Sequence, residues 1–242
     1  MVAGHSILKD PKNVHTLMGY LPEEPCFYEW MDGESFLYFI GDLFKIPNVE
    51  DRVNKLLKDA GLYEVRKRKI KKYSKGMKQR LGIAQALINN PKILFLDEPC
   101  SALDPMGRLE VLNTITKIKE ETTVFMSSHI LADIDRICNS VAIIDKGHLI
   151  TQSSMSELRN RFAKPMFKMV FEQEPVELER KLEKLDLIEG VKRNREELVV
   201  YVNDVERAKK ELPSYIISEY ALLKYELTSP TLEDIFINLV GQ

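Results

Sequence analysis

The stretch ILFLDEPCSALDP, residues 93–105, runs from a predicted buried strand straight into acidic side chains. Four apolar residues come first, the adjacent carboxylates Asp97 and Glu98 follow, and Asp104 lies beyond a turn of small residues. Two like charges side by side repel each other, and burial raises the free-energy cost of each. We therefore expect a cation or a transferable proton at the end of this strand.

The segments around this stretch predict an α/β fold with a parallel sheet. Residues 92–96 (KILFL) and 122–128 (TTVFMSS) are predicted to be short strands. Between them, Asp104 is a suitable N-cap, Pro105 suits the first helical position, and apolar residues then recur at helical spacing. A strand, a helix and a second strand form a right-handed βαβ unit, and ligands bind at the carboxyl ends of such strands.

A helical subdomain is predicted upstream of these strands. Residues 34–46 and 49–62 have the pattern of two amphipathic helices, and Gly61 is expected to end the second. No strand pattern interrupts them. We therefore assign residues 30–90, approximately, to a helical subdomain beside the sheet.

The sequence changes character after about residue 163, and we predict a small second domain over residues 164–242. Its order of strand, helix, strand, strand, helix, strand is that of a ferredoxin-like α+β fold. The expected strands are 166–172, 190–194, 197–202 and 215–227, and the expected helices are 176–185, 205–212 and a closing one at 229–241. Before this domain, residues 140–151 predict a hairpin that turns at Lys146-Gly147.

The composition limits the class of protein. The 242 residues are 44% hydrophobic and 30% charged, as in ordinary globular proteins. A net charge of −2 argues against general nucleic-acid binding, so no nucleic-acid partner is expected. No apolar run reaches the roughly 18 residues of a membrane span, so a membrane role would need a partner. Three widely spaced cysteines without a CxxC pair suit a reduced compartment and form no metal or disulfide framework.

Asp97 and Glu98 suit two kinds of chemistry at the strand end. An Asp at that edge can hold Mg²⁺, directly or through water, and a second carboxylate beside it can polarise an attacking water. The alternative is a pair of acids that only face the solvent.

Two further features suit phosphate binding. Ser74 and Gly76 precede a helix that begins near Met77, and Lys75 adds positive charge where the helix dipole already attracts anions. His129 directly follows a predicted strand, where a neutral imidazole can hydrogen-bond a phosphate oxygen. The alternatives are a plain N-cap on a basic surface helix and a structural histidine.

Taken together and in this order, four segments resemble the ATP-binding-cassette (ABC) transporter ATPases. They are YSKGM (73–77), ILFLDEP (93–99), SALD (101–104) and SSH (127–129), which resemble the family's signature, its Walker B strand, the following loop and its switch histidine. Residues 18–39 look like the family's Q-loop and the entry to its helical subdomain. The C-terminal domain, with TLEDIF at 231–236, is similar to ATPases that serve drug, antibiotic or lipid exporters. The resemblance covers essentially the whole chain.

The resemblance implies roles for the strand-end residues. Asp97 would help to hold Mg²⁺, and Glu98 would be the general base for the hydrolytic water. His129 would contact the γ-phosphate of ATP, and Asp104 would couple the two protomers of a cassette dimer. These roles imply ATP and Mg²⁺ as cofactors.

The resemblance also implies a nucleotide contact made by the helix N-terminus. Ser74 and Gly76 would dock on the γ-phosphate of a nucleotide held by the opposite subunit. Lys75 stands at a common glycine position of the signature and Met77 at a common glutamine position, and neither departure removes the anion site. Glu23 stands where the Q-loop glutamine is usual; its carboxylate can ligate Mg²⁺ but cannot donate a hydrogen bond when ionised.

One expected part of such an ATPase, the phosphate-cradling P-loop, is missing from the sequence. The P-loop pattern is G-x-x-x-x-G-K-[ST], and these residues contain no Gly-Lys pair. Only 22 residues precede Glu23, and they look like the tail of the strand and turn that follow a P-loop helix. We therefore expect residues 1–163 to be an N-terminally truncated ABC ATPase domain with a partial sheet, whose uncovered apolar surface favours association. Alone, this chain is not expected to hydrolyse ATP.

Three explanations of the missing P-loop stay open. Met1 can be an internal residue of a longer protein, or the gene can be a truncated remnant. The chain can also be a non-catalytic half-partner that lends Ser74 and Gly76 to a complete cassette.

The function implied is that of an ATP-binding and ATP-hydrolysing subunit that drives export through a separate integral membrane subunit. It would pair with a second cassette, as a homodimer or heterodimer, and lie on the cytoplasmic face of the membrane. One rival is a soluble ABC protein of translation or DNA repair, although neither a second cassette nor a long coiled-coil insertion is visible. The other rival is a non-catalytic regulatory or interaction module, which the missing P-loop favours. The transported substrate is not readable from this sequence.

Overall fold

The computed structural model describes residues 1–162, 165–217 and 220–240 and divides into two compact units. The first unit comprises Met1–Asp133 and the second Ile134–Gln242. The domain boundary predicted at residues 163 and 164 falls on residues outside the described ranges and stays a prediction.

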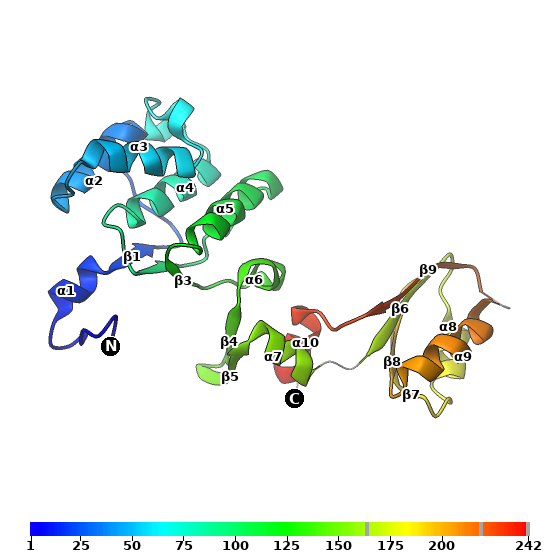
Figure 1. Ribbon diagram of the computed structural model, residues 1–242. Helices are drawn as coiled ribbons and strands as arrows, with labels where there is room; N and C mark the ends of the chain where they lie inside the picture. The colour runs from blue at the N-terminus through cyan, green and yellow to red at the C-terminus, as the bar shows by residue number, and fades with distance from the viewer. Residues whose placement is uncertain (163–164, 218–219, 241–242) are drawn as a thin grey trace. The chain divides into compact units, whose positions relative to one another are not determined.

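The first unit is a small parallel sheet with helices beside it (Figure 1). Its strands pair in the order β1-β2-β3, and both pairings are parallel. The elements in chain order are α1 (Pro11–Thr16), β1 (Met18–Leu21), α2 (Gly33–Leu43), α3 (Val49–Asp59), η1 (Tyr63–Val65), η2 (Ile70–Lys72), α4 (Lys75–Ala86), β2 (Ile93–Leu96), α5 (Pro105–Ile118) and β3 (Thr123–Met126). The predicted β2-α5-β3 unit and the helices of the upstream region are confirmed, whereas strand β1 was not expected.

Local signals explain where the helices of this unit begin and end. The Ser74 hydroxyl accepts a hydrogen bond from the Met77 N–H at 3.2 Å and caps α4, while Asp32 caps α2 through Ser35. Gly61, at φ +65°, follows α3 in the left-handed conformation that ends helices, as predicted.

One face of the parallel sheet is covered by α4. Leu21, Leu94 and Leu96 on this face are between 0% and 2% exposed. Glycines allow the close approach of strand and helix, because a Cβ added at Gly19 would lie 2.1 Å from the Ala86 carbonyl oxygen. The packing of α4 on β1 therefore depends on the missing side chain at Gly19 as much as on the apolar side chains of the sheet.

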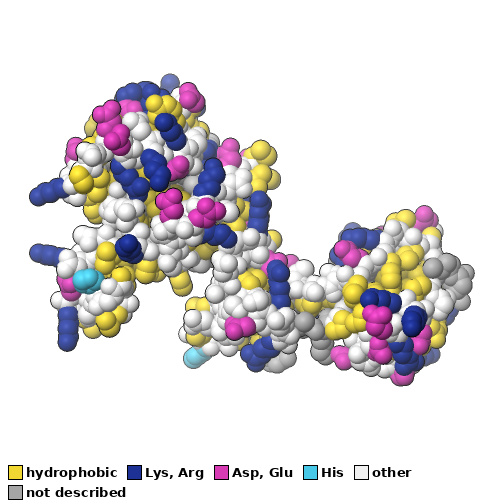
Figure 2. Space-filling view, in the orientation of Figure 1, with side chains coloured by type: hydrophobic (Ala, Val, Ile, Leu, Met, Phe, Trp, Pro, Cys, Tyr) yellow, Lys and Arg dark blue, Asp and Glu magenta, His cyan; other side chains and the backbone are white. Residues whose placement is uncertain are grey.

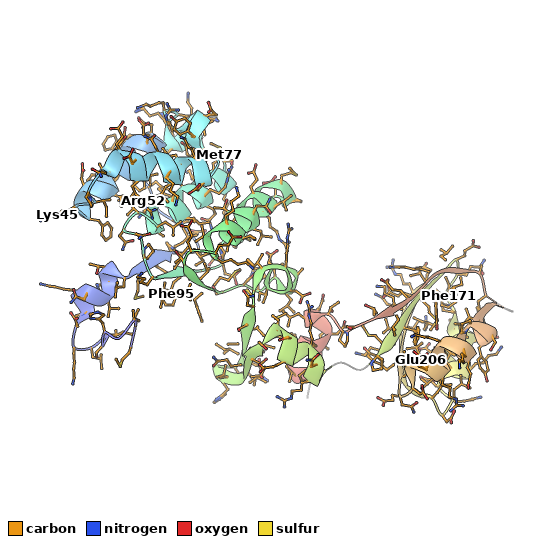
Figure 3. All side chains as sticks on the ribbon, viewed as in Figure 1. Lys45, Arg52, Met77, Phe95, Phe171 and Glu206 are labelled. Atoms are coloured by element: carbon orange, nitrogen blue, oxygen red, sulfur yellow. The ribbon has the colours of Figure 1, made fainter. Side chains whose placement is uncertain are left out.

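The opposite face of the same sheet carries exposed aromatic side chains. The strand register aligns Tyr20 with Phe95 and Phe95 with Phe125, and the last two rings are 5.6 Å apart. Tyr20 and Phe125 are 59% and 60% exposed, and Phe95 lies on the side of the sheet away from the helices (Figure 3). This surface matches the uncovered apolar face expected from the sequence; the self-association expected from it stays a prediction.

The second unit begins with a hairpin. The elements of this part are α6 (Leu131–Ile137), which starts before the division, β4 (Ser140–Asp145), β5 (His148–Ser154) and α7 (Met155–Arg161). Strands β4 and β5 are antiparallel, and Lys146 and Gly147 have φ values of +47° and +80°, so the predicted hairpin and its turn are confirmed. A capping box between Ser154 and Glu157 starts α7.

The rest of the second unit has the predicted ferredoxin-like order. Its elements are β6 (Met166–Phe171), α8 (Val176–Leu182), β7 (Ile188–Asn194), β8 (Glu197–Val202), α9 (Val205–Ile217), β9 (Leu222–Thr228) and α10 (Leu232–Val240). The antiparallel sheet has the order β7-β8-β6-β9, and side chains of β6, β8, α8 and α9 form its core. Gly241, expected to follow the closing helix, lies outside the described residues.

The strand predicted at residues 215–227 begins too early. Helix α9 continues to Ile217, and β9 starts at Leu222. The β-branched residues at 216 and 217 suggested a strand, but Ile216 is fully buried four residues after Leu212 on the same helix face. Burial in the core therefore outweighs the local strand preference.

Candidate functional site

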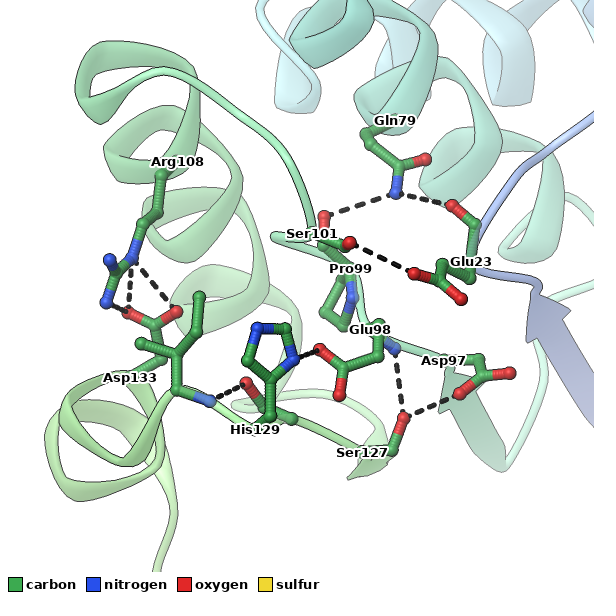
Figure 4. A network of polar contacts seen from close by, with 12 residues as sticks. Glu23, Gln79, Asp97, Glu98, Pro99, Ser101, Arg108, Ser127, His129 and Asp133 are labelled. Atoms are coloured by element: carbon green, nitrogen blue, oxygen red, sulfur yellow. Dashed lines mark hydrogen bonds and ion pairs between the residues drawn. The ribbon is translucent and has the colours of Figure 1, made fainter. Parts of the chain in front are cut away.

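The candidate site lies at the carboxyl end of β2, where the loop of residues 97–101 begins (Figure 4). Backbone hydrogen bonds continue beyond the strand ends: the Asp97 N–H donates to the Leu21 carbonyl, and the Ser127 N–H donates to the Leu96 carbonyl, both at 2.9 Å. The segments after β1, β2 and β3 are thereby held side by side at one edge of the sheet.

Ser127 links the two adjacent acids. Its hydroxyl donates to Asp97 Oδ1 at 2.7 Å and accepts from the Glu98 backbone N–H at 2.9 Å. A hydroxyl can do both at once, so a single side chain orients the Asp97 carboxylate and fixes the Glu98 backbone. Ser127 was not predicted as a site residue, although its place at the carboxyl end of a predicted strand, two residues before His129, was a usable signal.

Glu98 and His129 form a close pair. The Nδ1 atom of His129 lies 2.8 Å from Glu98 Oε2, with side chains 70% and 20% exposed respectively. An ionised carboxylate only accepts hydrogen bonds, so Nδ1 carries the proton in this contact. Glu98 also has φ +44°, and its carbonyl accepts a hydrogen bond from the Ser101 N–H at 3.0 Å. A left-handed non-glycine residue costs conformational energy and is typical of functional sites.

Hydrogen bonds hold the loop that carries Glu23 next to the loop after β2. The Ser101 hydroxyl donates to Glu23 Oε1 at 3.0 Å. The Gln79 amide of α4, which is 1% exposed, lies 3.3 Å from both the Glu23 and the Pro99 carbonyl oxygens. Neither Ser101 nor Gln79 was predicted as a site residue. The signal that could have indicated Gln79 was a glutamine two residues after Met77, inside the signature-like helix.

The signature-like helix N-terminus is presented to solvent. Ser74 and Lys75 are exposed, Met77 is half-buried, and Gly76 is buried against α5. A Cβ added at Gly76 would lie 3.3 Å from the Gly107 Cα, so the two helices meet at a pair of glycines. This packing places the start of α4 next to the start of α5.

Sequence-predicted site residues therefore fall into two groups. Asp97, Glu98, His129 and Glu23 meet around the loop after β2. Among the contacts of the described residues, none joins the other predicted residues to that group; these are Ser74, Lys75, Gly76, Met77 and Asp104. Asp104 is exposed just before α5 and makes no capping hydrogen bond with its side chain.

The donor set is suited to Mg²⁺, which prefers carboxylate and water oxygens. Asp97 and Glu23 supply carboxylate oxygens on neighbouring loops. Within the described ranges, no group of three or more His, Cys, Asp and Glu side chains is placed to hold a metal ion. A Mg²⁺ ion held by these two carboxylates would take its other ligands from waters and substrate phosphates, as is usual for this ion.

A separate aromatic pocket of about 390 Å³ lies in the helical part of the first unit. Its lining residues are Cys26, Phe27, Tyr28, Phe36, Phe39, Ile40, Leu43 and Gln85. The Phe27 and Phe36 rings are 5.3 Å apart, and those of Tyr28 and Phe39 are 5.7 Å apart. Tyr28, Phe39 and Leu43 remain 52%, 38% and 64% exposed, so the pocket is an apolar, open surface feature.

The chain is an α/β protein with paired acids and a histidine at the carboxyl edge of a parallel sheet, the edge where ligands bind in open α/β sheets. Residues 2–101 match the family model described as ABC transporter, and residues 154–240 match that of the C-terminal domain of ATP-binding protein DrrA1-3-like. The chain is 34% identical over 237 residues to "Uncharacterized ABC transporter ATP-binding protein YxlF" of Bacillus subtilis (strain 168), covering 97% of this chain and 79% of that protein. The chain therefore belongs to the ABC transporter ATP-binding protein family.

Other relatives agree with this assignment. "Bacitracin transport ATP-binding protein BcrA" of Enterococcus faecalis is 37% identical over 155 residues, which cover 62% of this chain and 50% of that protein. A solved structure described as "Structure of ATP binding subunit of ABC transporter" matches with a TM-score of 0.57 and 27% identity, covering 66% of this chain and 68% of the other. The family resemblance and the mixed α/β fold class predicted from the sequence are confirmed.

Members of this family use ATP, typically with Mg²⁺, and generally dimerise and pair with membrane subunits. In the described part of this chain, no helix is both long enough and apolar enough to cross a membrane.

Proposed function

We propose that this chain is the ATP-binding and ATP-hydrolysing subunit of an ABC exporter, and that it acts on a separate integral membrane subunit. The contact between Glu98 and His129 at the end of β2 carries the proposal. A mostly buried carboxylate held by an imidazole beside a second acid is an arrangement suited to activating water next to a metal-bound phosphate.

Each site residue has a stated role in this proposal. Glu98 accepts the proton of the attacking water through its carboxylate. His129 orients Glu98 by donating a hydrogen bond from Nδ1. To donate from Nε2 to a phosphate oxygen at the same time, the ring must be the imidazolium. Asp97 and Glu23 would hold Mg²⁺, which when bound would neutralise charge on the transferred phosphoryl group. Ser127 keeps the Asp97 carboxylate in place.

A second cassette completes the site. Ser74, Lys75, Gly76 and Met77 form a helix N-terminus with positive potential, which suits the γ-phosphate of a nucleotide held by the partner cassette. Asp104, exposed beside this N-terminus, couples the two cassettes. The phosphate cradle itself comes from outside these 242 residues, because they contain no Gly-Lys pair.

Isolation of the natural complex tests the proposal. The affinity-tagged chain is purified in detergent from its source cells, and the complex is photolabelled with an azido-ATP. We expect a membrane subunit, a second cassette and Mg²⁺-dependent ATP hydrolysis. Label on a protein heavier than 28.0 kDa that carries both this sequence and a Gly-Lys-Ser or Gly-Lys-Thr would mean a longer complete cassette. Label on a different cassette alone would mean a half-partner, and a complex without a membrane subunit would refute the transport role.

The aromatic pocket suits the contact with the membrane subunit, because aromatic residues in an open apolar pocket are typical of interface hot spots. Phe39→Glu puts a charge into this pocket and should reduce co-purification of the membrane subunit at least about tenfold. The measurement is quantitative mass spectrometry of the tagged complex. Phe44→Glu is the matched control, because Phe44 is 47% exposed near the end of the same helix and does not line the pocket. Equal recovery with both variants would exclude the pocket as the contact.

A further inference from the structure

Arg108 and Asp133 form an ion pair beside the candidate site. The Arg108 Nε atom donates to Asp133 Oδ1 at 2.8 Å and to Oδ2 at 3.0 Å, and a terminal guanidinium nitrogen lies 2.7 Å from Oδ1. The Asp133 side chain is only 3% exposed. A forked guanidinium contact to a buried carboxylate is geometrically specific, and removal of Arg108 would leave the buried Asp133 charge unpaired.

A third group, the Cys100 thiol, lies near the same carboxylate. Cys100 is 3% exposed, and the Asp133 charge influences the pKa of its thiol. Burial, with a smaller contribution from the Asp133 charge, raises the pKa of the Cys100 thiol to about 12. The thiol therefore stays protonated at neutral pH.

Arg108 and Asp133 belong to the segments that follow Glu98 and His129 in the chain. Cys100 lies two residues after Glu98, and Asp133 lies four residues after His129. Backbone contacts tighten the second segment, because the Asp133 N–H donates to the Ile130 carbonyl at 3.0 Å. The Arg108–Asp133 ion pair thus ties the segment that follows His129 to helix α5, which follows the loop with Glu98 in the chain (Figure 4).

We propose that Asp133, held by Arg108, is the positioning residue that keeps the His129 imidazole on the Glu98 carboxylate. In this role Asp133 acts through other groups and not on the reacting atoms. Its catalytic importance rests on the proposed function, whereas the geometric effect on His129 can be measured without any nucleotide.

The test is the ring signal of His129 in the full chain with ¹³C-labelled histidine. The sequence has only 4 histidines, so His129→Gln assigns the signal directly. Glu98→Gln should move the His129 signal, and Asp133→Asn should move it in the same direction by a comparable amount. The matched control is Asp135→Asn, which removes the partner of Arg159 at 2.7 Å and should leave the His129 signal unchanged.

Alkylation followed by peptide mass spectrometry provides a second readout. In the native chain buried Cys100 should be protected while exposed Cys26 reacts, and Asp133→Asn should make Cys100 reactive at least about tenfold faster because loss of the Arg108–Asp133 ion pair loosens the packing that covers the thiol. If Cys100 becomes reactive while the His129 signal stays in place, Asp133 is structural only and the proposal is wrong.

Two further measurements keep the test decisive. If Asp133→Asn does not fold, Arg108→Lys takes its place, because it keeps the charge but loses the fork, and the same shift of the His129 signal is required. In the assembled complex, the variant should lower kcat for ATP about tenfold or more with little change in KM, as expected for a misplaced group. A shifted His129 signal in a complex that hydrolyses no ATP would refute the proposed function and leave the positioning role intact.

Discussion

Glu98→Gln should reduce ATP turnover by the assembled complex at least about 10²-fold, because general-base catalysis contributes roughly 10²- to 10⁴-fold to rate. The amide has nearly the shape of the carboxylate but cannot accept the proton of the attacking water. It still accepts a hydrogen bond from His129 through its oxygen, so the loop after β2 should keep its conformation. ATP binding should therefore be retained while hydrolysis is lost.

The measurement combines phosphate release with binding of a fluorescent ATP analogue. The matched control is Glu120→Gln, which makes the same chemical change at an exposed residue just beyond the end of α5 and should leave turnover unchanged. Unaltered turnover in the Glu98 variant would remove Glu98 from the chemistry. Loss of both binding and turnover would indicate that the carboxylate acts in nucleotide binding instead.

The second large effect is expected at Gly19, where Ala should destabilise the first unit by about 3 kcal/mol, the upper end of the usual cost of overpacking. An added Cβ would lie 2.1 Å from the Ala86 carbonyl oxygen and 2.9 Å from Leu94 Cδ1. The first of these is helix backbone, which cannot rotate aside as a flexible side chain does. Helix α4 must therefore move off β1, and with it the Gln79 contact to the Glu23 loop.

Urea unfolding of the full chain measures this effect through the fall in the midpoint of the transition. Gly190→Ala in β7 is the control, because its added Cβ would meet only Tyr201 Cδ2, at an ordinary 4.0 Å. That change should be neutral or slightly stabilising, since Ala has less conformational freedom in the unfolded chain. A Gly19→Ala midpoint equal to that of the native chain would show that the βα contact is looser than described.

Local sequence patterns predicted much of the fold. The apolar run before Asp97 marks β2, Asp104 and Pro105 mark the start of α5, and Lys146-Gly147 marks the hairpin turn. In each case a few consecutive residues carry the whole signal. Strand β1 was missed because its four residues, interrupted by Gly19, lie in a segment interpreted as the Q-loop.

The sequence by itself determined the family, the parallel βαβ unit, the ferredoxin-like order and the strand-end acids, because each depends on residue types close together in the chain. Only the tertiary structure decided which groups meet there. Ser127 and Asp97 are 30 positions apart, Ser101 and Glu23 are 78, and Asp133 and Arg108 are 25. A hydrogen bond requires a distance near 3 Å and a suitable angle. The packing of helices on the sheet, at glycine contacts such as Gly19, sets this distance and angle. No local sequence pattern encodes that packing.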